Sequence, residues 1–71
     1  MKLIDIATFD FPNDSDIIES ILLADNIPYF INRQSYTYIF PGSGGVLSVN
    51  ENDREQVIQI IKKAGFERFL I

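Results

Sequence analysis

The length, composition and charge of this 71-residue chain allow one small globular domain, spanning residues 1–71, and exclude several kinds of chemistry. Because the chain has no cysteine and no histidine, it cannot form disulfides, thiolate metal sites or the usual neutral-pH proton shuttle, and we predict neither a metal nor another cofactor. Ten acids against six scattered bases give a net charge of -4, which repels nucleic acid and anionic lipid surfaces.

The first part of the chain predicts a strand followed by a helix. Residues 2–8 are rich in apolar and β-branched side chains, as strands are. Asn13 is the predicted N-cap of a helix over residues 14–25, in which aspartates near the start complement the helix dipole and apolar side chains recur at the helical period. Asn26 stands where a left-handed C-terminal cap is expected.

The remaining elements are three strands and a second helix. Strands are predicted at residues 27–31, 45–50 and 66–71. The second helix is predicted over residues 53–64, where Asn52 and Glu55 have the spacing of a capping box and two lysines complement its C-terminal end. Gly65 follows this helix as Asn26 follows the first.

The two halves of the chain therefore repeat one pattern. Asn13 and Asp14 correspond to Asn52 and Asp53, and Phe30 corresponds to Phe69, at one constant offset. A strand-helix-strand unit cannot bury its apolar face alone and packs on its twin. The order β-α-β-β-α-β predicts an α+β, ferredoxin-like fold, a four-stranded antiparallel sheet with both helices on one face.

The segment between the two halves, residues 32–45, has no counterpart in the repeat. Residues 36–40 have strand character and could extend a hairpin into the strand that follows. Residues that could bind a ligand or a partner gather in this segment: a cation, an amide, two phenols and a glycine-serine turn, namely Arg33, Gln34, Tyr36, Tyr38, Gly42, Ser43 and Gly44.

Two interpretations of this segment stay open. An arginine beside aromatic side chains could recognise a carboxylate or phosphate, and a glycine-rich turn could present backbone amides to an anion. Alternatively, the same residues form a solvated hairpin end and a turn between strands, because a strand rather than a helix follows the glycines.

Both faces of the predicted sheet carry apolar side chains. Ile27 and Ile31 point to one face and Phe30 to the other, and the last strand alternates in the same way. Only one face lies under the helices, so we interpret the other as a homo-oligomer contact or a surface for a protein partner. The alternative is that short strands expose a few apolar atoms, as most proteins do.

The sequence NIPYFI at residues 26–31 and the sequence VNEND at residues 49–53 carry a family resemblance. With the acidic helix before them, they resemble a small bacterial family of prokaryotic signal-transducing proteins, a domain of unknown function whose fold is likened to the nitrogen-regulatory PII proteins. The chain departs from the family pattern at Asn26, where glycine is usual, and at Leu23, where a polar residue is common. The resemblance implies a PII-like fold and a signalling role.

Together these patterns predict a non-enzymatic regulatory, signal-transducing interaction module that binds a protein partner or its own copies. The alternative is a sensor of a small anion or metabolite bound at residues 32–45. Asp5 stands where a secretion signal would be apolar, and no apolar run approaches the roughly 20 residues that span a bilayer, so we expect a cytoplasmic protein without membrane contact.

Overall fold

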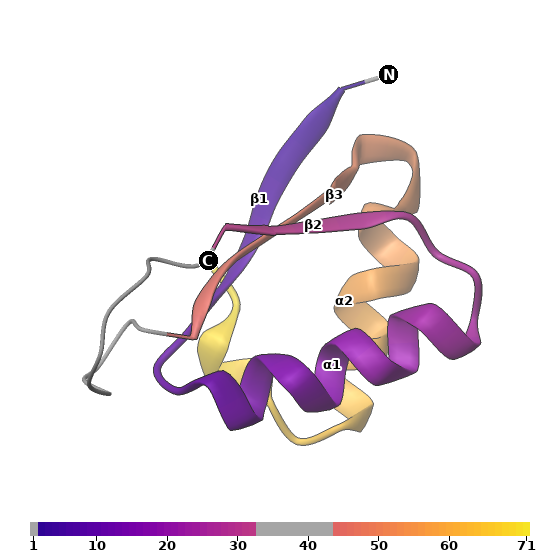
Figure 1. The fold of residues 1–71 in the computed structure, drawn as a ribbon. Coiled ribbons are helices and arrows are strands. Elements are labelled where there is room, and N and C mark those ends of the chain that lie inside the picture. Colours follow the sequence, from indigo (N-terminus) through magenta and orange to yellow (C-terminus); the bar gives the residue numbers. More distant parts are fainter. Residues whose placement is uncertain (1, 33–43) are drawn as a thin grey trace.

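A computed structural model of the protein describes residues 2–32 and 44–71, which form an α+β fold. Within these residues, three strands and two helices follow one another (Figure 1), with a short 3₁₀ helix on either side of the second helix. The elements in order are β1 (Leu3–Phe9), α1 (Pro12–Ala24), β2 (Tyr29–Asn32), β3 (Gly45–Asn50), a 3₁₀ turn (Glu51–Asp53), α2 (Arg54–Lys63) and a second 3₁₀ turn (Glu67–Phe69).

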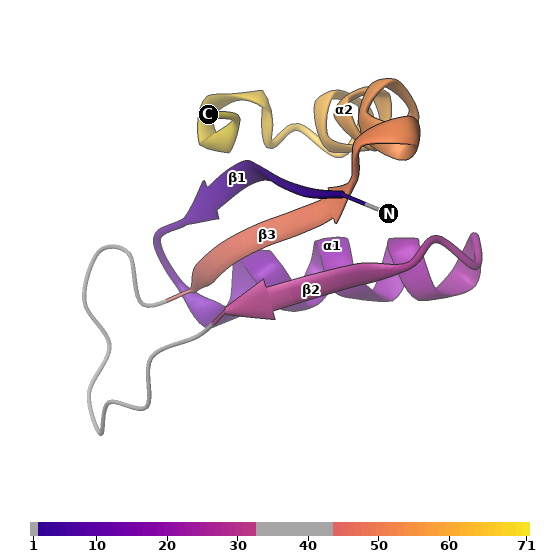
Figure 2. The ribbon, with the colours of Figure 1, turned by 90° about the horizontal axis from the view of Figure 1, so that it is seen from above.

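The sheet of the described residues has three strands in the order β1-β3-β2, and both pairings are antiparallel. Figure 2 shows β3 in the centre, with β2 at one edge of the sheet. A bulge at Ile6 interrupts the pairing of β1 with β3, so that Asp5 faces Ser48 and Ala7 faces Leu47. The pairing of β2 with β3 is regular throughout its four residues.

Both helices cover one face of this sheet. Leu47 and Val49 of β3 point to that face and are fully buried against side chains of α1 and α2. The buried core joins all these elements in one cluster: Ile6, Ala7, Phe9, Ile18, Leu22, Ile27, Leu47, Val49, Val57, Ile61 and Phe69. The predicted placement of both helices on one side is therefore confirmed.

The fourth strand predicted at residues 66–71 is not present as such. Instead, Glu67–Phe69 form a 3₁₀ turn, and only Leu70 makes a bridge to β1, opposite Ala7. Strand alternation would place Phe69 on the face that the helices leave uncovered. The 3₁₀ turn carries it into the core, where its ring lies 5.4 Å from that of Phe9.

The predicted N-caps are wrong at both helices. Helix α1 begins at Pro12, one residue before Asn13, because proline has the φ of a first helical position and needs no donor there. Before α2, the chain forms a 3₁₀ turn in which the side chain of Asn50 accepts a hydrogen bond from the amide of Asn52 at 3.0 Å. The capping box of Asn52 and Glu55 therefore does not form, since α2 begins only at Arg54.

The predicted C-caps are confirmed, and they are the same at both helices. Asn26 has φ 57° and Gly65 has φ 84°, the left-handed conformation that ends a helix. After each, one amide returns to a carbonyl five residues earlier: Ile27 to Leu22 and Phe66 to Ile61, each at 3.0 Å. The repeat seen in the sequence is thus a repeated helix end.

Candidate functional site

Most of the predicted binding residues lie outside the described part of the chain. Arg33, Gln34, Tyr36, Tyr38, Gly42 and Ser43 fall there, as do residues 36–40, whose sequence has strand character. Of the predicted set, the structure places Gly44 alone.

Gly44 packs against the turn between β1 and α1. It is buried, and a Cβ atom added to it would lie 2.5 Å from the carbonyl oxygen of Phe11 and 2.8 Å from Cβ of Phe9. Such distances leave no room for a side chain, so close packing against backbone explains this glycine. The C-terminal end of the 32–45 segment is therefore fixed beside Phe11, at the start of α1.

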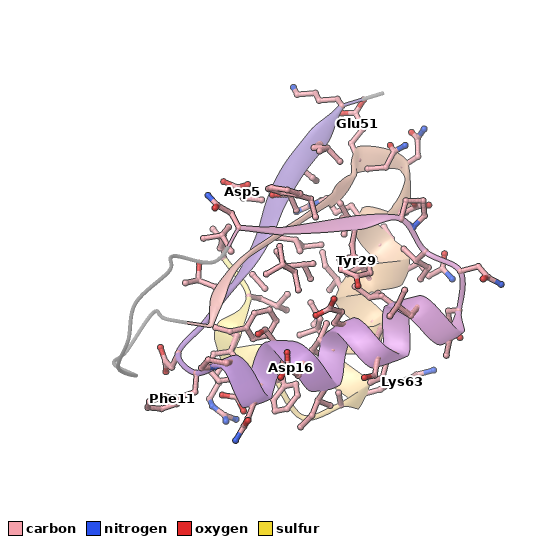
Figure 3. The ribbon with its side chains drawn as sticks, viewed as in Figure 1. Asp5, Phe11, Asp16, Tyr29, Glu51 and Lys63 are labelled. Atoms are coloured by element: carbon pink, nitrogen blue, oxygen red, sulfur yellow. The ribbon has the colours of Figure 1, made fainter. Side chains whose placement is uncertain are left out.

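The uncovered face of the sheet is mixed rather than apolar. Figure 3 shows Asp5 on the side away from both helices. On this face Asp5, Ser48 and Phe30 form one row across the three strands, since Ser48 stands opposite both of the others. Ser48 is buried, and its Oγ donates a hydrogen bond to Oδ1 of Asp5 at 2.7 Å. In contrast, Phe30 is 55% exposed and Leu3 is 52% exposed.

A groove of about 370 Å³ lies where α1 leads into β2. It is lined by Leu23, Asn26, Ile27, Pro28 and Tyr29. Tyr29 is held in place from α1, because its hydroxyl donates to Oε1 of Glu19 at 2.6 Å. Figure 3 shows the Tyr29 side chain on the helix side of the sheet. Leu23, which lines the groove, is 62% exposed and lies off the apolar stripe of α1. A leucine at that position of the helix is the signal in the sequence for this surface.

A second groove, of about 340 Å³, separates the C-terminal turns of the two helices. It is lined by Ile21 of α1 and Asp25 directly after that helix, and by Ile60 and Lys63 of α2 and Ala64 directly after that helix. Its walls are aliphatic, with one acid and one base among the lining residues. This arrangement offers a small apolar surface with opposite charges in its lining.

Charge is unevenly divided along the chain. Residues 1–33 hold six acids and two bases, a net charge of -4, whereas residues 44–71 hold four of each. Helix α1 and the residue after it carry four acids and no base, namely Asp14, Asp16, Glu19 and Asp25. Four of the six acids of residues 1–33 therefore lie on α1 or directly after it.

Within residues 2–32 and 44–71, no cluster of three or more carboxylates is placed to hold a metal ion. In the same residues, neither helix is long and apolar enough to cross a membrane.

Comparison with known proteins identified no relative. No family model matches the sequence, and neither a curated protein nor a solved structure matches it. The resemblance to prokaryotic signal-transducing proteins therefore stays a prediction.

Proposed function

We propose that this protein is a non-enzymatic regulatory module that acts by binding another protein. The observation that carries the proposal is the pair of large apolar side chains, Leu3 and Phe30, which are more than half exposed on the sheet face that the helices leave uncovered. Burying exposed apolar area against a partner is favourable by about 25 cal/mol per Å², and aromatic side chains in particular anchor interfaces.

The proposal includes the finer fold and a signalling role. The strand order β1-β3-β2, with a bridge from Leu70 to the free side of β1, supports a ferredoxin-like, PII-like arrangement in which the fourth strand has shrunk to one residue pair.

A sensor of a small anion or metabolite at residues 32–45 is the second candidate. Its support is the position of Gly44, which fixes one end of that segment beside Phe11, at the start of α1. In this case Arg33 would bind the anion.

Capture experiments test the first candidate. The whole protein, immobilised, is expected to retain a discrete protein from a bacterial lysate, and Phe30→Ser is expected to abolish that retention. Ile17→Ser is the matched control, because Ile17 is an apolar residue of similar exposure on α1. Equal retention by both variants would contradict a contact at the sheet face.

Thermal-shift screening with nucleotides, inorganic phosphate and amino acids separates the two candidates. A binding module is expected to show no stabilisation by any of these compounds, because a ligand raises the melting temperature only when it binds the folded state. A shift that Arg33→Ala abolishes would favour the sensor instead.

A further inference from the structure

Asp5 is the one charged residue in the three strands that the structure describes, since every other residue of β1, β2 and β3 is uncharged. Strand alternation and the pairing with Ser48 place it on the face that the helices leave uncovered, and Figure 3 shows it on that side. A single carboxylate on an otherwise uncharged sheet face determines which partners that face can bind.

The Asp5 carboxylate has acceptor positions to spare. It accepts a hydrogen bond from Oγ of Ser48 at 2.7 Å, which is the one hydrogen bond or ion pair that its side chain makes within residues 2–32 and 44–71. An ionised carboxylate has about four acceptor positions, and Asp5 is exposed, so water can occupy the others. A partner that covers Asp5 removes this water and must supply donors in its place, because a buried charge without a partner is costly.

Apolar side chains flank Asp5 on the same face. Leu3 lies two residues before it on β1, and Phe30 lies beyond Ser48 in the same row, about 10 Å away across the two strand spacings that separate β1 from β2. Leu3 and Phe30 are each more than half exposed. A segment that matches this face therefore presents a positive side chain with apolar side chains on either side of it.

The strands of a second copy do not supply that positive side chain. The three described strands contain neither lysine nor arginine. Lys2 adjoins β1, but strand alternation places it on the opposite face from Leu3 and Asp5. Two copies joined through their uncovered faces would bring two carboxylates into the contact with no strand residue to neutralise them, which favours a different protein as the partner.

We propose that the uncovered face of the sheet binds a segment of another protein in which a lysine or arginine, flanked by apolar side chains, pairs with the Asp5 carboxylate between Leu3 and Phe30. The hydrogen bond from Ser48 orients the carboxylate, which makes Ser48 a positioning residue for this contact. The inference rests on the proposed binding function and names the chemistry of the partner.

Selection from a random peptide library displayed on phage tests this chemistry. The immobilised whole protein is expected to enrich peptides that share a lysine or arginine with apolar side chains next to it or two residues away. Resynthesis of an enriched peptide with uncharged norleucine in place of its base is expected to weaken binding at least about tenfold. Enriched peptides without a base, or the absence of any enriched peptide, would overturn the proposal.

Asp5→Asn locates the contact. Asparagine has nearly the same shape and keeps an acceptor for the Ser48 hydroxyl, so the fold is retained while the charge is lost. Peptide binding is expected to weaken at least about tenfold. Asp25→Asn is the matched control, because Asp25 is an exposed acid directly after α1, and binding by this variant is expected to stay unchanged. Equal effects of the two variants would indicate a general attraction to an acidic protein and would overturn the proposal.

Two further measurements separate this inference from the proposed function. If Phe30→Ser abolishes capture of a lysate protein while Asp5→Asn leaves capture unchanged, the inference fails and the proposed function stands. If neither variant changes capture, both fail. Sedimentation that shows a dimer of the unaltered protein, dissociated by Phe30→Ser, would make a second copy the occupant of the face and overturn the inference.

Discussion

The hydroxyl of Ser48 donates a hydrogen bond to the carboxylate of Asp5 at 2.7 Å, between residues that face each other across β3 and β1. This contact lies on the sheet face away from the helices, where Phe30 occupies the next position along the same row. Ser48 is only 8% exposed, so its hydroxyl has little access to water and needs this partner. The row thus holds a satisfied polar pair beside an exposed aromatic ring.

Ser48→Ala is expected to lower the free energy of unfolding by about 1–2 kcal/mol, because it removes a hydrogen bond to a carboxylate. Urea denaturation measures the loss. Ser20→Ala is the matched control: its hydroxyl bonds to the carbonyl of Asp16 on an exposed helix face, and its loss is expected to stay within about 0.5 kcal/mol. Equal losses would mean that the Ser48 contact adds nothing beyond a surface bond.

Gly44 and Gly65 are expected to differ in how much stability the same substitution costs. Gly44→Asn places a Cβ against the backbone of Phe11 and is expected to destabilise the fold by at least about 2 kcal/mol. Gly65→Asn meets no atom within 4 Å, and asparagine tolerates the left-handed conformation, so its loss is expected to be about 0.5 kcal/mol. A thermal melt of each variant distinguishes them, and a mild Gly44→Asn would contradict the close approach at Phe11.

Local patterns in the sequence were sufficient to predict the ends of several elements. The strand at residues 45–50 has the predicted bounds, and both left-handed caps are where Asn26 and Gly65 predict them. The N-caps failed because Pro12 and the 3₁₀ turn at Glu51–Asp53 compete with Asn13 and Asn52 for the same role. A capping side chain is one of several ways to begin a helix.

Tertiary contacts explain what the sequence could not predict. The residues of the last segment alternate like a strand, yet burial of Phe69 against Phe9 favours a 3₁₀ turn, and this contact joins distant parts of the chain. The groove beside Tyr29 was missed for a related reason. Leu23 stands out in the helix pattern, but only the fold brings it to the first residues of β2.

Exchange of the helix caps between the two halves is expected to show that they are equivalent. Asn26→Gly recreates the cap of α2 and is expected to raise the free energy of unfolding by up to about 1 kcal/mol, because glycine adopts φ 57° without strain. Alanine has a β-carbon but does not tolerate the left-handed conformation as asparagine does. Asn26→Ala is therefore expected to lower the free energy of unfolding by about 1 kcal/mol. Thermal melts rank the three proteins, and alanine at or above glycine would contradict a left-handed cap.

Phe69 is expected to be essential to the fold although it lies two residues before the last described residue, Ile71. Its ring packs on Phe9 and under the guanidinium of Arg68, which lies 4.4 Å from the ring centroid. Phe69→Ala is expected to remove about 3–5 kcal/mol, close to the whole stability of so small a domain, while Phe69→Leu loses about 1–2 kcal/mol and stays folded. Ile71→Ala is the control, since Ile71 is 76% exposed and its loss should stay within about 0.5 kcal/mol. If residues 66–71 formed a fourth strand, Phe69 and Ile71 would lie on the same face of the sheet. Similar denaturation midpoints for Phe69→Ala and Ile71→Ala would therefore support that strand and contradict the 3₁₀ turn.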